Sequence, residues 1–302
     1  MSAFPITGSL ATISSVTAAT DVKTLFDTLK ITEVTINTEA DEFDISELSG
    51  SGAAVERLAG LRSGTMNFSG IYPKSAPKVG NTGLVTYGGN VAGYVADWTM
   101  DVDFGETEVT SFASTAPTVK QFMPNGLLTW GGSFNMHMMN IDNALDSATN
   151  DEVTLPTAVG STGSAAIFRI FTGASNNHEL SGNVLLKSLG HAIKKADKQV
   201  LAYSYSGSGA LTEKQGDTYS TLLVASTSAG TSTAVGARNW SPNATPANST
   251  PAVTVQLYSV GGSPTRTYAF AAFMKSVSIN VSPGNPITVS GSLRIFDTIA
   301  TA

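Results

Sequence analysis

The fold of this chain is decided by a short stretch at residues 60–68, GLRSGTMNF, which occurs a second time at residues 126–134 as GLLTWGGSF. Both copies begin with Gly-Leu, carry a hydroxyl residue at the fourth position and reach Phe at the ninth. An internal repeat governs the organisation of a whole chain. We interpret each copy as a turn that leads into a strand. The positions that define the motif are Gly60, Leu61, Ser63, Phe68, Gly126, Leu127, Thr129 and Phe134.

The repeat extends beyond this motif. Alternation of apolar and polar residues at 34–37 (VTIN) predicts a half-buried strand, and the pattern returns 64 residues later at 98–101 (WTMD). At the glycine motif the offset is 66, so a two-residue insertion separates the copies. Because both offsets are even, each residue keeps its side of the sheet, and Glu39 falls on Asp103. We therefore expect a true duplication.

A second repeat occupies the later half of the chain. Residues 187–189 (KSL) resemble residues 275–277 (KSV), 88 positions further on. Each opens an alternating strand, followed by a polar turn and another strand, which is the pattern of a β-hairpin. We call the two copies of the first repeat the early units and the two copies of the second repeat the late units. Along the chain, both early units precede both late units. Nested pairing, in which the first early unit joins the last late unit, needs the simpler connections, although crossed pairing stays open.

These patterns predict an all-β fold with a minor helical part, built from two tandem or nested β-sandwich domains. Residues 1–30 would form an N-terminal arm and a short helix, since Val22, Leu25, Phe26 and Leu29 make one apolar face. Residues 31–92 plus 217–302 would form a first, split domain. Residues 93–216 would form a second, inserted domain. We interpret residues 74–93 as a loop and residues 217–251 as a long loop or linker, because small, polar and turn-forming residues fill them.

Composition narrows the function. Charged residues make up 13% of the 302 residues, about half of the usual ~25%, and the net charge is −6. This balance argues against a protein that grips nucleic acid, which needs basic patches. The absence of cysteine excludes disulfides and thiolate metal sites. The N-terminus lacks the regions of a signal peptide and no run reaches ~18 apolar residues, so we expect a soluble protein without a membrane partner.

No motif supports catalysis, and we expect no catalytic, cofactor or metal site and no enzymatic activity. The three histidines, His137, His178 and His191, lack a second ligand at metal-binding spacing. The acidic run from Glu39 to Glu47 lacks the spacing of a calcium-binding loop, and a solvated surface explains it better. Asp101 and Asp103 could act as an acid/base pair only in a cleft.

In the order and repetition of these motifs, the chain resembles the tail tube (major tail) proteins of long-tailed bacteriophages. The hydroxyl-bearing strands around 44–46 (DIS) and 108–110 (EVT), each leading to the Gly-Leu motif, are similar to that family's early half. The hairpin at 283–288 (PGNPIT) and, less closely, residues 196–200 (ADKQV) resemble its later half. The resemblance covers most of residues 31–298. It departs from the family in length, because members commonly have one such domain and this chain has two by our interpretation.

The resemblance implies tail-tube-like β-sandwiches that join into a ring with a continuous inner β-barrel. Rings stack into the tube through which the genome is ejected. It also implies a chain made in the host cytoplasm that ends in the virion, as part of the phage tail. Its partners would be copies of itself, the tape measure, the tail terminator and the distal tail protein, with DNA passing through the lumen without specific binding. Family rings are commonly six-fold, so a duplicated chain would close as a trimer with pseudo-six-fold symmetry, with a hexamer as the alternative.

An acidic lumen suits a DNA conduit, because carboxylates repel phosphates and a basic wall would hold DNA. We accordingly place four acidic residues on lumen-facing strand positions: Glu39, Asp41, Asp101 and Asp103. The alternative function is another virion or surface β-sandwich protein, such as a capsid decoration or a carbohydrate-binding adhesin module. Such a module needs an exposed aromatic platform, for which Trp98, Trp130 and Trp240 are the candidates. A hydrolase on a β scaffold would instead show a cleft with perturbed carboxylates.

Overall fold

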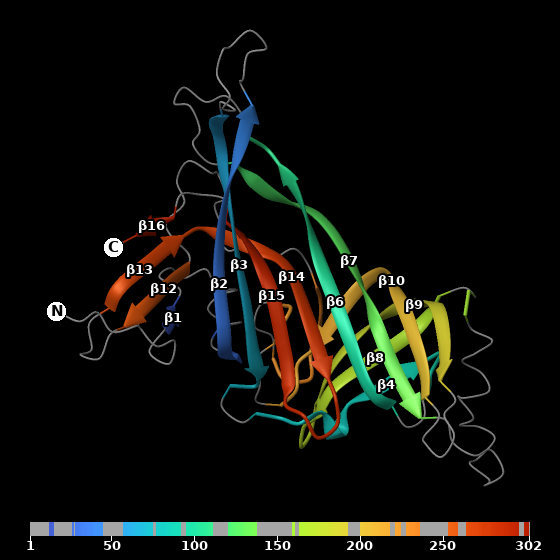
Figure 1. Cartoon of the computed structure of the whole chain (residues 1–302). Helices are drawn as coiled ribbons and strands as arrows, with labels where there is room; N and C mark the ends of the chain where they lie inside the picture. Colours follow the sequence, from blue (N-terminus) through green and yellow to red (C-terminus); the bar gives the residue numbers. More distant parts are fainter. Residues whose placement is uncertain are drawn as a thin grey trace, which may run out of the picture.

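The computed structural model of the chain (Figure 1) describes residues 12–14, 26, 28–44, 57–74, 77–91, 95–110, 120–137, 159–160, 163–192, 200–217, 221–224, 228–235, 253–258, 264–295 and 299–301. The fold is all-β, as the alternation predicted. The helical backbone in the described part is a short 3-10 helix, η2 (Gly80–Thr82), together with Phe26 and Thr28. The helix predicted near residues 20–30 lies mostly outside the described residues. Phe26 and Leu29, on its expected apolar face, are both buried.

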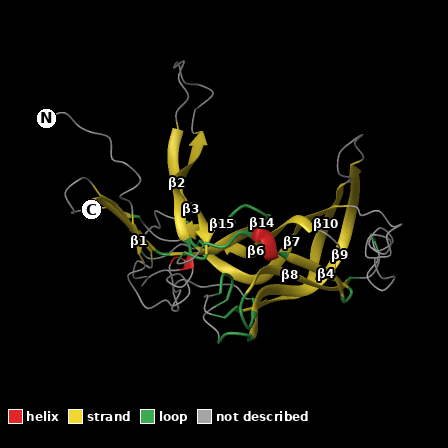
Figure 2. Cartoon of the chain, turned by 90° about the horizontal axis from the view of Figure 1, so that it is seen from below, coloured by secondary structure: helices red, strands yellow, loops and turns green. Residues whose placement is uncertain are grey.

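One large antiparallel sheet forms the body of the molecule (Figures 1 and 2). Its first eight strands, in spatial order, are β2 (Lys30–Asp44), β3 (Arg57–Tyr72), β15 (Ile287–Ile295), β14 (Ala272–Val281), β6 (Val95–Glu108), β7 (Phe122–His137), β10 (Val200–Lys214) and β9 (Asn177–Ala192). Beyond β9 the sheet continues with β8 (Ser164–Thr172), β4 (Leu84–Tyr87) and β5 (Asn90–Val91), while β11 (Ser232–Ala234) pairs with β10. A separate sheet contains β1 (Thr12–Ser14), β12 (Val253–Tyr258), β13 (Pro264–Phe270) and β16 (Ala300–Thr301).

The strand order is a tandem of two four-strand units. The first unit is β2-β3-β15-β14, and the second is β6-β7-β10-β9. β3 pairs with β15 and β7 pairs with β10, so each early strand pair lies beside the late pair that the nested arrangement requires. The units meet where β14 pairs with β6, and one hydrophobic core runs through both.

Irregularities in the ladders repeat at the same offsets as the sequence. The β2–β3 ladder shifts register at Ile31/Glu33, and the β6–β7 ladder shifts 64 residues later at Val95/Asp97. A second shift, at Ala40/Glu42, recurs at Phe104/Glu106 with the same offset. In the late strands, Lys187 of β9 is an extra residue that bulges out of its ladder. Its repeat equivalent, Lys275 of β14, bulges out in the same way. Since β-bulges disrupt a ladder and are retained as specific features, these matches extend the duplication to single backbone positions.

The glycine motif is a bulge rather than a turn, which corrects the expectation from sequence. Its two copies lie inside β3 and β7, which are continuous strands. Gly60 and Leu61 stand opposite Asp41, in the part of the ladder where register is lost, and Gly126 stands in the equivalent part opposite Gly105. Glycine relieves crowding at an extra residue of a strand, so it marks a bulge as readily as a turn.

Two segments expected to be loops contain ordered structure. β4 lies within residues 74–93 and pairs with β8, although the expected boundaries assigned these strands to different domains. Residues 221–224, expected to lie in a linker, are buried beside β10, and β11 adds to the edge of β10. Both ordered segments are short, and their order comes from distant partners rather than from local periodicity.

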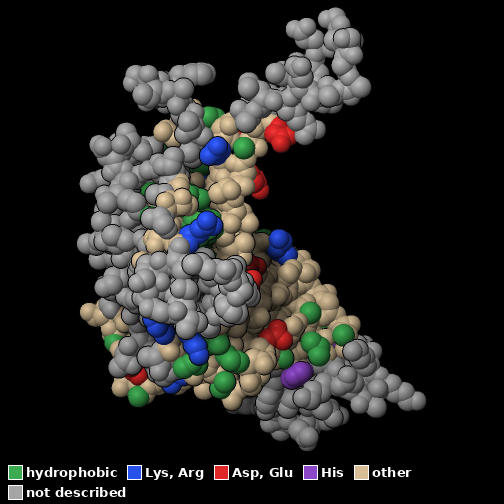
Figure 3. Space-filling model, turned by 60° about the vertical axis from the view of Figure 1, so that its left-hand side comes forward, with side chains coloured by type: hydrophobic (Ala, Val, Ile, Leu, Met, Phe, Trp, Pro, Cys, Tyr) green, Lys and Arg blue, Asp and Glu red, His purple; other side chains and the backbone are tan. Residues whose placement is uncertain are grey.

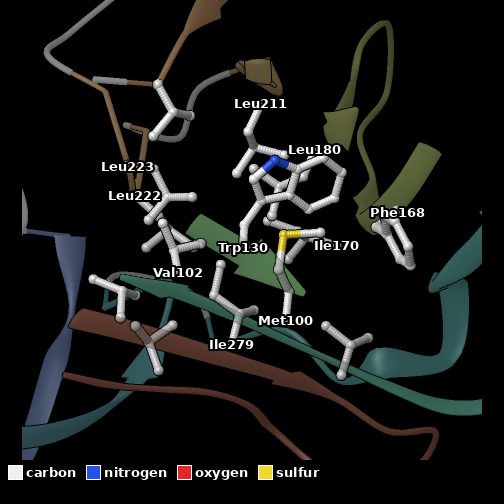
Figure 4. Close-up of a cluster of buried hydrophobic side chains, with 14 of the residues drawn as sticks. Met100, Val102, Trp130, Phe168, Ile170, Leu180, Leu211, Leu222, Leu223 and Ile279 are labelled. Carbon is white, nitrogen blue, oxygen red and sulfur yellow. The ribbon is translucent and has the colours of Figure 1, made fainter. Parts of the chain in front are cut away.

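Alternation along β6 shows how the sheet places its two faces. Trp98, Met100, Val102 and Phe104 are each at most 1% exposed, whereas the residues between them point to the opposite side. The apolar face packs against the layer that β8 and the first half of β9 form. Phe168 of β8 lies 5.7 Å from the ring of Trp98 and stacks on Tyr205 at 4.7 Å. Figure 4 shows this core around Trp130, with side chains converging from several strands.

Candidate functional site

The opposite, polar face of the eight-strand sheet is the first candidate site. A groove of about 840 Å³ runs along it and is lined from β3, β15, β14, β6, β7, β10 and β9. Most of the lining side chains are small and polar, because every second residue of these strands is Ser, Thr, Asn, Asp or Gly. Those that contribute to the groove include Asn67, Ser278, Ser290, Asp101, Thr129 and Ser206.

Hydroxyl groups pair across neighbouring strands on this face. Ser276 and Ser292 hydroxyl oxygens lie 2.8 Å apart, and those of Ser188 and Ser204 lie 2.5 Å apart. The hydroxyl oxygen of Thr99 lies 3.0 Å from that of Ser133. Because these hydroxyl groups pair with one another, they form a surface of short polar side chains rather than a set of projecting binding groups.

Carboxylates gather on the two repeat-equivalent strands β2 and β6. Glu39, Asp101 and Asp103 all lie on the polar face, opposite small residues of the neighbouring strand. Asp103 is paired in register with Thr129 of the repeat motif, as Glu39 is with Ser63. In one view of the surface, acidic side chains lie along a hollow with Lys and Arg close by (Figure 3).

Asp41, the fourth predicted residue, differs from the other three. It lies opposite the bulge of β3, where the register of the ladder shifts, and its carboxylate is 2.9 Å from the ammonium of Lys120. This hydrogen bond with Asp41 raises the pKa of Lys120 above its ordinary value. The structure thus brings three of the four acidic residues onto one face and engages the fourth in an ion pair.

A cationic cluster that the sequence did not predict stands where the two units meet. The carboxylate of Glu106 accepts a hydrogen bond from Nε of Arg294 at 2.9 Å and one from Lys275 at 3.2 Å. Burial of this carboxylate opposes ionisation, but Arg294 and then Lys275 outweigh that effect, so the pKa of Glu106 is lowered. The guanidinium of Arg294 also stacks over Phe122, 4.4 Å from the ring centre. The only signal in the sequence was the repeat of Lys275 as Lys187.

The edges of the eight-strand sheet form a second candidate site. In the described part of the chain, β2 has a neighbour only on its β3 side. β8 covers β9 from Asn177 to Val184, and the rest of β9 is paired with β10 alone among the described strands. Open strand edges with exposed backbone groups are sites for adding another strand.

The remaining motif residues support the core. Phe134 is 1% exposed and stacks on Tyr203 with ring centres 4.9 Å apart. Its counterpart Phe68 packs edge-to-face on Phe26 at 5.4 Å. Leu127, by contrast, is 67% exposed at the bulge. Of the three tryptophans considered for a carbohydrate platform, Trp98 and Trp130 are buried, and Trp240 lies outside the described residues.

A buried polar network around Glu213 was missed by sequence reasoning. The Glu213 carboxylate is fully buried and lies 2.7 Å from Nε2 of His178, whose Nδ1 lies 2.9 Å from the hydroxyl of Tyr72. The same carboxylate accepts hydrogen bonds from three consecutive backbone amides, those of Leu222, Leu223 and Val224. The network fastens residues 221–224 to β10, which is a structural role.

Among the described residues, no group of three or more His, Cys, Asp or Glu side chains could hold a metal ion. The helical segments that the structure describes include none with the length and apolar character needed to cross a membrane. In sequence comparisons, no protein-family model matches the chain, and no curated protein matches it either.

Proposed function

We propose that this chain is a structural virion protein that self-assembles into stacked rings, the tail tube of a long-tailed bacteriophage. The observation that carries this proposal is the tandem strand order. Two units of four strands follow each other in one sheet, each with the same order, the same bulges and the same cross-strand serine pair. A chain of this kind already contains one junction between two ring positions.

Ring formation accounts for the open edges. A sheet that ends in two different free edges joins head to tail, and such contacts close into a ring when the rotation between neighbours permits. Three chains would then supply six equivalent units around an inner β-barrel, with a six-chain ring as the alternative.

The polar face would line the lumen of this barrel. Paired serine and threonine hydroxyls offer DNA no fixed positive charge, and Glu39, Asp101 and Asp103 repel its phosphates. The cations of this face at the unit boundary, Lys275 and Arg294, are already engaged with Glu106. DNA would therefore pass without being held.

In the virion the tube would contact the tape measure inside, the tail terminator at one end and the distal tail protein at the other. Its role would be mechanical, with no cofactor and no catalytic step. The apolar face of the sheet, packed against β8 and β4, would form the wall that separates the lumen from the outside.

Electron microscopy of the purified full-length chain tests the proposal. Negative-stain images at increasing protein concentration should show rings or tubes, and a reconstruction without imposed symmetry should show six similar units built from three chains. A protein that stays monomeric at high concentration would refute the proposal. A ring whose polar sheet face points outward would refute the assignment of the lumen.

A further inference from the structure

The junction between the two units gives a complete example of how one unit joins the next. β14 pairs with β6 from Ser276 opposite Asp103 to Val281 opposite Trp98. On the apolar side of this junction, Val277, Ile279 and Met100 are at most 1% exposed. On the polar side, the ion pair of Lys275 with Glu106 closes one end.

The repeat assigns an equivalent to every strand of this junction. β9 is the repeat equivalent of β14 and lies 88 residues earlier in the sequence. β2 is the repeat equivalent of β6 and lies 64 residues earlier. Residues 276–280 of the internal junction therefore correspond to residues 188–192 of β9. β8 pairs with β9 only as far as Val184. The part of β9 that matches the junction is thus a part that β8 leaves uncovered.

We infer that β9 of one copy pairs with β2 of the next copy, antiparallel and in the register of the internal junction. Ser188 then lies opposite Glu39, Gly190 opposite Asn37 and Ala192 opposite Thr35. This inference rests on the proposed ring assembly and specifies the contact that closes it.

The side chains at the two edges suit this contact. Leu189, Val34 and Ile36 are half-buried in the isolated chain and pack against the core from its two ends. Their equivalents in the internal junction are Val277, Trp98 and Met100, which are almost fully buried. Pairing of β9 with β2 covers the exposed parts of the edge residues in the same way and extends the core from copy to copy.

An ion pair also repeats. Lys187 occupies the bulge that corresponds to that of Lys275. Glu42 lies directly after the residue of β2 that opposes the bulge of β3, as Glu106 lies directly after the residue of β6 that opposes the bulge of β7. Lys187 and Glu42 are both exposed. In the inferred register the ammonium of Lys187 meets the carboxylate of Glu42 in the next copy. The repeat equivalent of Arg294 is Ser206, which carries no charge. The contact between copies therefore has one cation, whereas the internal junction has two.

Cysteine cross-linking tests the register directly, because the natural chain has no cysteine. A Cβ added at Gly190 would lie 3.8 Å from its nearest neighbours, so Gly190→Cys is accommodated. Directly opposed residues of an antiparallel pair have Cα atoms about 4.5–5.5 Å apart, within the range of a disulfide. The double variant Asn37→Cys/Gly190→Cys, oxidised after assembly, should give covalent dimers and trimers on a non-reducing denaturing gel, with the trimer as the largest product of a closed three-chain ring.

Two further double variants serve as controls. Asp101→Cys/Ser278→Cys is the internal counterpart and should form its disulfide within one chain, detected by mass spectrometry. Asn37→Cys/Ser188→Cys shifts the register by two residues on the same face and should link poorly. Tubes in which the shifted pair links better than the matched pair would overturn the register and leave the proposed function intact. A chain that neither assembles nor cross-links overturns both.

Charge reversal gives a readout that does not depend on disulfide geometry. Lys187→Glu should weaken association about tenfold, since a like-charge contact replaces an attraction. Glu42→Lys should do the same, and the double variant Lys187→Glu/Glu42→Lys should recover assembly. Equal loss of assembly in the double variant would overturn the ion pair.

Discussion

The hydroxyl oxygen of Ser276 lies 2.8 Å from that of Ser292, and the repeat reproduces this contact 88 residues earlier between Ser188 and Ser204 at 2.5 Å. The two pairs occupy matching places in hairpins that lie at different positions of one sheet. The bulged lysine beside each pair repeats as well. A duplication that preserves bulges and side-chain pairs preserves the shape of each unit. Each unit can therefore present the same contact to its neighbour, which is the condition for ring symmetry.

The ion cluster at the internal junction should make stability depend on acid pH. Glu106→Gln should lower the free energy of unfolding by about 1–2 kcal/mol at pH 7, because Arg294 and Lys275 lose their charged partner. The folded pKa of Glu106 lies below its ordinary value of 4.5. Its contribution is therefore present above that ordinary value and is lost as pH falls through the lower folded value. Urea unfolding of both proteins between pH 7 and pH 3 should show the difference shrinking below pH 4.5.

Glu33→Gln provides the control for this pH series. Glu33 is exposed on β2, away from the cluster. Its substitution should leave the pH dependence of the wild type unchanged. A difference in unfolding free energy between Glu106→Gln and the wild type that stays constant down to pH 3 would contradict stabilisation by the ionised carboxylate of Glu106.

Glu213→Gln should lower the free energy of unfolding more than Glu106→Gln does. Glu213→Gln leaves one carbonyl oxygen for His178 and the amides of Leu222, Leu223 and Val224, so two or more buried donors lose their acceptor. We expect a loss of about 2–4 kcal/mol in the free energy of unfolding. Glu179→Gln is the matched control. Glu179 bonds Arg169 at 2.9 Å in a partly exposed pair, whose loss should cost less than about 1 kcal/mol. Equal effects of the two substitutions would contradict the role of the network.

Sequence reasoning predicted the parts of the fold that local alternation encodes. Trp98, Met100 and Val102 alternate with polar residues, so the strand and its two faces were predictable. The offsets of 64 and 88 residues then identified which strands are equivalent, and the observed pairs of β3 with β15 and β7 with β10 follow the simpler of the two connections considered.

The features that were missed depend on distant partners. β4 spans only Leu84–Tyr87 between glycines, and its order comes from pairing with β8. Glu213 is followed by a polar segment, and nothing near it in sequence shows that residues 222–224 return to cap its carboxylate. The Gly60 motif was mistaken for a turn because a bulge is a property of two strands, and the partner strand is not visible in the motif itself.

The close packing of β10 against the indole ring of Trp130 depends on glycine. A Cβ at Gly207 would lie 2.0 Å from the indole ring of Trp130, which is held in place by a hydrogen bond from Nε1 to the carbonyl of Gly209 at 3.1 Å. Gly207→Ala should therefore lower the free energy of unfolding by about 1–3 kcal/mol and alter tryptophan fluorescence. Gly190→Ala, whose Cβ would have its nearest neighbours at 3.8 Å, should change stability by less than about 0.5 kcal/mol. Similar free energies of unfolding for both variants would show that the indole ring of Trp130 can move aside without loss of stability.

Charge on the polar face should decide whether assembled tubes retain DNA. Asp101→Lys/Asp103→Lys replaces carboxylates with ammonium groups at exposed positions of β6, and every phosphate contact adds counterion release. Tubes of this variant should retain double-stranded DNA in a filter-binding assay at about 50 mM salt and release most of it by about 200 mM. Wild-type tubes should retain none. Asp101→Asn/Asp103→Asn removes the same carboxylates without adding positive charge and should also retain none, since a hydroxyl and amide wall has no cation to offer. DNA retention by the wild type, or none by the lysine variant despite intact tubes, would show that this face does not line the lumen.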